Sequence, residues 1–205
     1  MIPEISIIVT NYNYSRYLER CLRSCLNQRD VDFEVILVDD CSTDNVSEVV
    51  KPFLCDITYL RNKENLGVAE TSNIGIRASR GRFFIRVDAD DYINEEACYF
   101  LRRVLADNKN AFGVACDYIH VDKHEEKLQR FSAKENPISC GVLYRKDLFL
   151  QQGGYNSEFR YKEHEEFLKR LDGFYEIFYL PIPFYRYRRH GENKTLHEEY
   201  KKVEV

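Results

Sequence analysis

The first ninety residues alternate short apolar runs with segments in which apolar residues recur at helical spacing. The apolar runs are rich in β-branched residues, which is typical of strands buried on both faces of a parallel sheet. The four predicted strands are Ile5–Thr10, Phe33–Val38, Ile57–Leu60 and the run that begins at Phe83. Strands that alternate with helices over short connections form doubly wound sheets with right-handed crossovers. The pattern therefore predicts an α/β fold whose mostly parallel sheet is flanked by helices.

The segments between these strands predict three helices. The first is the clearest, with apolar residues at Leu18, Leu22 and Leu26, and Ser15 precedes it as a suitable N-cap. Two further helices are predicted over Val46–Phe53 and Val68–Ala78.

Three carboxylates follow the fourth strand within four residues: Asp88, Asp90 and Asp91. Alternate residues of an extended segment share a side, so Asp88 and Asp90 can direct oxygens at one point. Carboxylates held that close repel, and a cation with a preference for oxygen ligands, Mg²⁺ or Mn²⁺, would balance them. The alternative is a solvated acidic turn that caps a helix beginning near Glu95.

Polar residues end three of the four predicted strands, at Thr10-Asn11, Asp39-Asp40 and Asp88-Ala89-Asp90. Ligands of doubly wound sheets bind beyond the carboxyl ends of the strands. Because these ends meet at one edge of the sheet, the three clusters are expected to converge although they are far apart in sequence. This convergence favours a binding site over a solvated turn.

The second half of the chain has a less regular pattern. We expect a helix around Ala97–Leu105, a strand over Phe112–Val121 and a mobile, charged loop from Asp122 to Pro137. A short helix over Asp147–Gln152 and a helix that opens at Glu163 follow. Two final strands are predicted at Phe174–Leu180 and Phe184–Arg188. No internal repeat or linker divides the chain, which predicts one domain over residues 1–205.

Composition excludes several classes of protein. A net charge of −4 and a pI of about 5.8 provide no basic field for nucleic acid. The 7 cysteines form no disulfide or zinc pattern, which predicts reduced, mostly buried thiols in a cytoplasmic chain. No signal peptide pattern and no apolar run of bilayer length is present. The apolar stretch Phe174–Tyr185 can still lie at a membrane surface, so peripheral association with the inner face stays open.

Four motifs in this order and spacing resemble family 2 glycosyltransferases of the GT-A fold, which is Rossmann-like. They are Ser6–Asn13, Val38–Asp44, Asn65-Leu66-Gly67 with Asn73 and Gly75, and Asp88–Asp91. The resemblance is densest over residues 5–91 and implies transfer of a sugar, usually from a UDP-sugar, to a hydroxyl with inversion at the anomeric carbon. It also implies a nucleotide-binding half at 1–91 and an acceptor-binding half at 92–205.

The resemblance also implies roles for individual residues. Thr10 and Tyr12 would lie against the base and Asp40 would accept a hydrogen bond from it. Asp88 would contact the ribose or the metal, and Asp90 would ligate the metal, Mn²⁺ or Mg²⁺, that bridges the diphosphate. The remaining implied nucleotide contacts are Asp39, Asn65 and Gly67, and His190 would fold over the diphosphate and its metal.

The base of the family's reaction is an acidic residue that opens a late helix, often within a Glu-Asp pair. Here the corresponding stretch departs from the pattern, because His164 takes the usual Asp position between Glu163 and Glu165. Either glutamate or His164 itself is a candidate base, and an impaired site is the third possibility. The implied partners are a nucleoside diphosphate sugar and a saccharide or lipid-linked acceptor, as in surface polysaccharide or glycolipid assembly.

Two alternative functions accompany this interpretation. The altered base position is compatible with a subunit that binds a nucleotide sugar without turning it over. A sugar-1-phosphate nucleotidylyltransferase would need a glycine-rich loop after the first strand, and the loop Asn11–Tyr14 contains no glycine.

Overall fold

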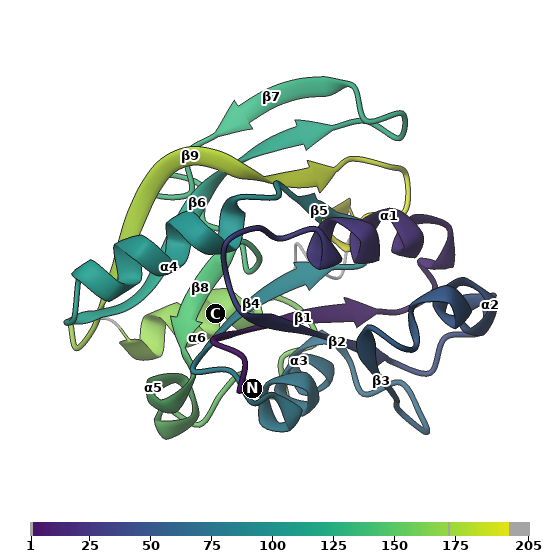
Figure 1. Ribbon diagram of the computed structural model, residues 1–205, viewed down its shortest axis with the longest axis horizontal. Coiled ribbons are helices and arrows are strands. Elements are labelled where there is room, and N and C mark those ends of the chain that lie inside the picture. The colour runs from purple at the N-terminus through teal and green to yellow at the C-terminus, as the bar shows by residue number, and fades with distance from the viewer. Residues whose placement is uncertain (1, 172, 197–205) are drawn as a thin grey trace.

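A nine-stranded mixed sheet with helices on both faces forms the centre of the molecule (Figure 1). The computed structural model describes residues 2–171 and 173–196. Within these residues the strand order is β3-β2-β1-β4-β8-β6-β9-β5, and β7 pairs with β6 beyond β8, on the edge opposite β9. Strands β3, β2, β1 and β4 are parallel, as predicted, and β8 joins β4 in antiparallel orientation.

The first half of the chain follows the predicted order of strands and helices closely. Its elements are β1 (Ile5–Asn11), α1 (Ser15–Leu26), β2 (Phe33–Asp39), α2 (Val46–Val50), the 3₁₀ turn η1 (Lys51–Phe53), β3 (Ile57–Arg61), α3 (Val68–Ala78) and β4 (Phe83–Asp88). The predicted α/β fold is confirmed.

The start of α1 differs from the prediction. Ser15 is the first helical residue and Tyr14 is the N-cap, without a side-chain capping bond. The carboxylate of Asp44 instead accepts a hydrogen bond from the backbone N–H of Ser15 at 2.8 Å. A residue 29 positions away thus satisfies one of the free N–H groups at the helix start, which local sequence rules cannot foresee.

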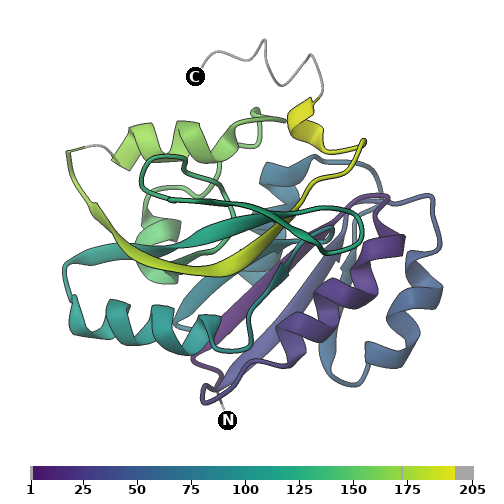
Figure 2. The ribbon, with the colours of Figure 1, turned by 90° about the horizontal axis from the view of Figure 1, so that it is seen from above.

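The second half adds strands of both directions and three helices. Its elements are β5 (Tyr92–Ile93), α4 (Ala97–Asp107), β6 (Ala111–Val121), β7 (Lys127–Phe131), β8 (Val142–Arg145), α5 (Lys146–Gln151), α6 (Glu163–Leu171), β9 (Glu176–Arg188) and η2 (Lys194–Leu196). Strand β9 runs parallel to β6 along its whole length, and the two lie side by side in Figure 2.

Two expectations for this half were wrong. The segment 122–137 is not a loop throughout, because Lys127–Phe131 pairs with β6 as strand β7. Its residues are almost all exposed, so no apolar alternation marks the strand in the sequence. The two predicted final strands are one continuous strand, β9. Its ladder with β6 shifts register at Asp117, near prolines that lack an N–H to donate.

The sheet separates two apolar layers. Helices α1, α2 and α4 pack on the face that carries Ile7 and Val9, whereas α3, α5 and α6 pack on the face that carries Ile8. Helix α3 can pack closely against β1 because Gly75 has no side chain. A Cβ added at Gly75 would lie only 2.5 Å from Ile8 Cγ2. All seven cysteines are free and five of them are buried, so the prediction of mostly buried thiols is confirmed. Across the described residues, no helix is both long enough and apolar enough to span a bilayer.

Candidate functional site

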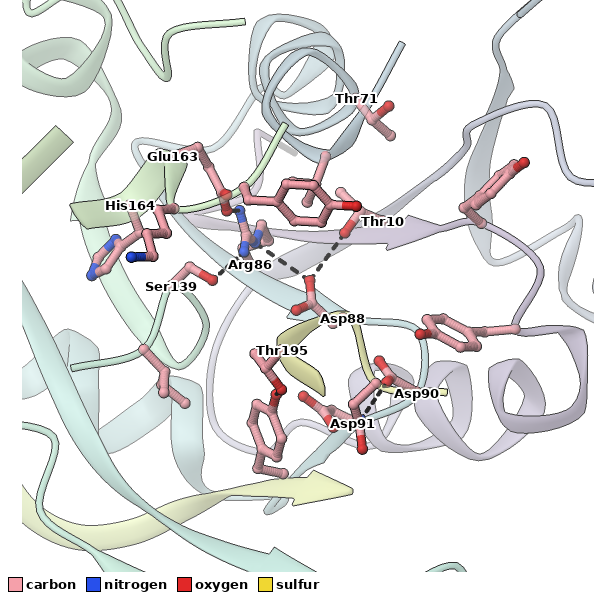
Figure 3. Close-up of a pocket in the computed structure, with 18 of the residues that line it drawn as sticks. Thr10, Thr71, Arg86, Asp88, Asp90, Asp91, Ser139, Glu163, His164 and Thr195 are labelled. Carbon is pink, nitrogen blue, oxygen red and sulfur yellow. Dashed lines mark hydrogen bonds and ion pairs between the residues drawn. The ribbon is translucent and has the colours of Figure 1, made fainter. Parts of the chain in front are cut away.

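A cavity of about 370 Å³ lies beyond the carboxyl ends of β1, β2 and β4, where the polar strand ends converge as predicted. Thr10, Asp40 and Asp88 contribute one wall. The opposite wall combines the start of α6, the loop before β8 and the residues that follow β9. Figure 3 shows Thr10, Asp88, Arg86 and Glu163 side by side in this cavity.

Thr10 and Asp88 are joined directly at the end of neighbouring parallel strands. The Thr10 hydroxyl donates to Asp88 Oδ1 at 3.1 Å, which orients the carboxylate within the cavity. Tyr12, the residue directly after β1, also lines the cavity. A hydroxyl, an aromatic ring and a carboxylate therefore occupy the edge that the sequence assigned to a nucleotide.

Asp40 lines the cavity and also holds the start of α3. Its carboxylate accepts hydrogen bonds from the backbone N–H groups of Leu66 and Gly67 at 2.8 and 2.9 Å, and from the side chain of Asn62 at 2.9 Å. Negative charge at a helix N-terminus is favourable, so these bonds fix the orientation of Asp40. Oδ1 accepts from both Asn62 and Leu66, whereas Oδ2 accepts from Gly67, so Oδ2 keeps a lone pair that can accept one further hydrogen bond.

Three residues that the sequence assigned to the nucleotide lie behind this wall and do not line the cavity. Asp39 is fully buried and accepts from Asn11 Nδ2 at 2.9 Å and from the Ser42 hydroxyl. Asn65 donates to the Asp40 carbonyl at 3.5 Å, and Gly67 has a φ of +85° at the N-cap of α3. The structure gives these three residues a supporting position around Asp40.

Asp88 and Asp90 both line the cavity but differ in exposure. The Asp88 side chain is 32% exposed, whereas that of Asp90 is 10% exposed. Burial raises the pKa of Asp90, the hydrogen bond from His190 lowers it and the charge of Asp88 raises it again, with a net increase. The two carboxylates therefore repel each other, as expected from the sequence.

His190 closes over Asp90. Its Nδ1 accepts a hydrogen bond from the Glu192 N–H at 3.2 Å, so the neutral ring carries its proton on Nε2. That Nε2–H donates to Asp90 Oδ2 at 2.9 Å, and Asn193 Nδ2 lies 3.4 Å from the same oxygen. The imidazole also packs against the rings of Tyr14 and Tyr17. His190 and Asp90 thus come together although 100 positions separate them.

Asp91 has a structural position. Its carboxylate accepts from the Tyr185 hydroxyl at 2.6 Å and from the Arg188 N–H at 2.7 Å. Burial and the charges of Asp90 and Asp88 raise the pKa of Asp91 well above its usual range. The third acid of the cluster therefore ties β9 to the end of β4, and it is 2% exposed.

Arg86 is the site residue that the sequence analysis missed. It is 2% exposed on β4, and its Nη1 donates to Glu163 Oε1 at 2.8 Å. Its Nε lies 3.5 Å from Asp88 Oδ1, and its Nη2 donates to the Ser139 hydroxyl. The available signal was a single arginine in an apolar strand, two residues before Asp88 and hence on the same side.

The three candidate bases occupy different environments at the start of α6. Glu163 is buried in the ion pair with Arg86, whereas Glu165 is exposed and lines the cavity. His164 is buried against the Tyr144 hydroxyl, at 3.5 Å from Nδ1. Burial and the charge of Arg86 lower the pKa of His164 to about 3, so its ring is neutral at physiological pH.

The carboxylate oxygens of Asp88 and Asp90 fit a hard divalent cation that is also coordinated by the phosphates of a bound substrate. Among residues 2–171 and 173–196, no group of three or more His, Cys, Asp or Glu side chains is arranged as a metal cage. Mg²⁺-type ions are usually bound by one or two carboxylates together with substrate phosphates. Two repelling carboxylates on one cavity wall meet that requirement.

The sheet order and the cavity at the strand ends define an α/β protein of the GT-A class. Two solved structures share its fold. TarS residues 1–349 from S. aureus, in complex with UDP-GlcNAc, align with a TM-score of 0.76 at 22% identity, over 98% of this chain and 62% of that one. A mannosyltransferase from Pyrobaculum calidifontis with GDP-Man and Mn²⁺ aligns with a TM-score of 0.75 at 18% identity, over 94% and 59%.

The chain belongs to glycosyl transferase family 2, whose model matches residues 6–190. An uncharacterized glycosyltransferase from Haemophilus influenzae is 30% identical over 185 residues, which cover 82% of this chain and 61% of the relative. The chain thus spans less than two thirds of the length of that relative. The resemblance inferred from the four motifs is confirmed at the level of the family.

Proposed function

We propose that the chain transfers a sugar from a nucleoside diphosphate donor, a UDP-sugar, to an acceptor hydroxyl with inversion. The observation that carries the proposal is the convergence of three parallel strand ends on one cavity with Asp40, Asp88 and Asp90 in its wall. Residues 1–91 would bind the nucleotide and residues 92–205 the acceptor. By analogy with the family, the product would belong to a surface polysaccharide or glycolipid.

The donor assignment rests on Asp40, Thr10 and Tyr12. An oriented carboxylate beside a ring can accept the N–H of a uracil while the ring contacts the base. Asn65 and Gly67 would act on the nucleotide through Asp40, because they donate to its carbonyl and its carboxylate. Asp39 would act through Asn11 and Ser42, which donate to its carboxylate. The TarS structure, which shares the fold, contains UDP-GlcNAc.

Asp88 and Asp90 would hold Mn²⁺ or Mg²⁺ together with the diphosphate. A divalent ion bound there would stabilise the negative charge of the leaving phosphate as a Lewis acid. The Nε2 atom of His190 carries a proton and donates it to Asp90 Oδ2, so Nε2 cannot ligate a metal in this arrangement. On donor binding, His190 would either leave Asp90 or direct its Nε2–H at an oxygen of the nucleoside diphosphate.

Glu165 is the base that this arrangement favours. The pKa of His164, about 3, makes the imidazole a weak proton acceptor at neutral pH. Glu163 is engaged by Arg86, and a base in a buried ion pair would lose that pairing on protonation. Glu165 is on the same turn of α6, is exposed and lines the cavity, so it can reach an acceptor hydroxyl.

A binding subunit without turnover is the second candidate, favoured by the buried, neutral His164 at the usual Asp position. The test measures UDP release and sugar transfer with UDP-sugars, Mn²⁺ and a panel of saccharide and lipid-linked acceptors. Glu165→Gln is expected to reduce transfer by roughly 10²- to 10⁴-fold with little change in UDP affinity. Glu158→Gln, an exposed glutamate outside the cavity, is the matched control.

Two results would contradict parts of this proposal. UDP binding without turnover in any combination would support the binding subunit. Full activity in Glu165→Gln would remove Glu165 from the reaction and leave the donor assignment intact.

A further inference from the structure

Four rings form a continuous aromatic surface where strands β7, β6 and β9 pair. Tyr118 and His120 alternate on β6, Phe131 lies opposite Tyr118 on β7, and Tyr187 lies opposite His120 on β9. Directly opposed residues of neighbouring strands share a face of the sheet, as do alternate residues of one strand. The four side chains therefore lie on one face of three adjacent strands, and we name them the aromatic platform.

The rings of the aromatic platform are in direct contact. Tyr118 and Phe131 stack with centroids 5.3 Å apart and an interplanar angle of 11°. The His120 ring lies 4.3 Å from Phe131 and 5.1 Å from Tyr187. Tyr118 is 5% exposed and belongs to the apolar core, so the platform is continuous with the core through this ring.

The aromatic platform faces the same cavity as the acidic cluster, since Tyr118, His120 and Tyr187 all line it. It lies on the opposite side of β4 from the nucleotide edge, because β1 and β2 flank β4 on one side and β8, β6 and β9 follow on the other. A ligand on the platform would therefore meet Asp88 and Asp90 from the side away from Asp40.

The platform carries no charge of its own. Burial and the nearby Arg189 lower the pKa of His120, so its imidazole is neutral at physiological pH. Polar groups stand at its margin: Arg189 and Thr195 line the cavity, and the Tyr187 hydroxyl lies 3.4 Å from Thr195 Oγ1. Flat neutral rings with polar groups at the edge provide one apolar face and directional hydrogen bonds.

From this geometry we infer that the aromatic platform binds a pyranose ring of the acceptor, with the C–H face of the sugar stacked on His120 and Tyr187. Aromatic faces carry negative partial charge and attract the positively polarised C–H bonds of a sugar face, while Arg189 and Thr195 are placed to bond its hydroxyls. The inference rests on the proposed function and adds the chemical class of the acceptor: a saccharide, as opposed to a ringless alditol phosphate or a bare lipid phosphate.

The test measures saturation transfer from the protein to small probes by NMR, in the presence of UDP and Mn²⁺. The probes are methyl β-N-acetylglucosaminide, methyl β-glucuronide and methyl α-glucoside, with glycerol 3-phosphate as the ringless comparison. At least one pyranoside is expected to receive saturation at the C–H protons of one face. Glycerol 3-phosphate is expected to receive none above a sample without protein.

The variants separate stacking from other effects. His120→Ala removes a ring that faces the cavity and is expected to weaken pyranoside binding roughly tenfold. His120→Phe restores a flat ring and is expected to retain binding. Tyr179→Ala is the matched control, because Tyr179 is on β9, is 40% exposed and does not line the cavity.

Each outcome is decisive. Equal binding of a pyranoside to His120→Ala and the unchanged protein would overturn the inference, as would stronger saturation of glycerol 3-phosphate than of any pyranoside. UDP affinity, measured by calorimetry in the same samples, distinguishes the two proposals. If UDP binds and no pyranoside does, the acceptor inference fails alone, whereas failure of UDP to bind would count against the proposed function.

Discussion

The two halves of the molecule build their parts of the cavity in different ways. In residues 5–91 each polar group follows its own strand, and the parallel register of β1, β2 and β4 is enough to bring Thr10, Asp40 and Asp88 together. In the second half, the residues that line the cavity come from β6, from the loop before β8, from the start of α6, and from β9 and the chain beyond it. Their positions depend on contacts between segments far apart in sequence.

Arg86 connects the two halves. It is on β4, yet its guanidinium reaches Glu163 on α6 at 2.8 Å and lies 3.5 Å from Asp88. A buried cation shared by two carboxylates couples the acid at the donor edge to the helix that carries the candidate bases. The comparison thus teaches that the donor edge is set by strand register, whereas the opposite wall is held by a few buried polar contacts.

The largest expected effect tests the donor half. Asp90→Asn keeps the shape of the side chain but removes its charge, so UDP-sugar turnover with Mn²⁺ is expected to fall about 10³-fold through lost stabilisation of the leaving phosphate. Steady-state UDP release measures the effect. Asp107→Asn, an exposed residue at the end of α4, is the control. Undiminished turnover in Asp90→Asn would show that the cluster does not hold the metal.

The second largest effect is expected at the ion pair between Arg86 on β4 and Glu163 on α6. Arg86→Met leaves the buried Glu163 without its cation and is expected to lower the free energy of unfolding by about 3–5 kcal/mol, measured with urea. Adding Glu163→Gln to that variant removes the unpaired charge and is expected to recover part of the loss. A double variant no more stable than Arg86→Met would mean that the pair does not couple β4 to α6.

A smaller effect concerns pH and the second half. The pKa of folded His164, about 3, is below the ordinary value of 6.5, so its contribution to stability is complete above pH 6.5 and is lost as pH falls toward 3. Between pH 7 and pH 5 the unchanged protein is expected to lose about 2 kcal/mol more than His164→Gln. Urea unfolding at both pH values is the measurement. The exposed His124→Gln should retain the full loss, and an equal loss in His164→Gln would contradict the assignment.

The smallest effect is expected in the first half, at Gly67, the N-cap of α3. Gly67 has a φ of +85°, and a Cβ there would lie 3.7 Å from Arg160 Cγ, which is ordinary contact. Gly67→Ala is therefore expected to cost about 1–2 kcal/mol through backbone strain alone, measured by urea unfolding. Gly191→Ala adds a Cβ with no atom within 4 Å and should be neutral. Equal stabilities for the two variants would show that the turn before α3 can relax.

The sequence was sufficient for the first half because short-range patterns specify it. The β-branched runs, the helical spacing of Leu18 to Leu26 and the polar strand ends each lie within one element, and parallel register then carries the ends to one edge. Even here, the capping of α1 by Asp44 instead of Ser15 needed the tertiary structure, since the cap comes from another loop.

Only the tertiary structure divided the acidic cluster into its parts. Sequence spacing pairs Asp88 with Asp90 but does not reveal their partners. In the structure Asp91 bonds to Tyr185 and Arg188, Asp90 bonds to His190, and Asp88 stays partly exposed beside Arg86. It likewise revealed β7, whose exposed residues carry no alternation, and the burial that makes His164 a poor base. The physical reason is common to all three: burial and charge pairing are properties of neighbours in space, and the neighbours here are up to 100 positions apart.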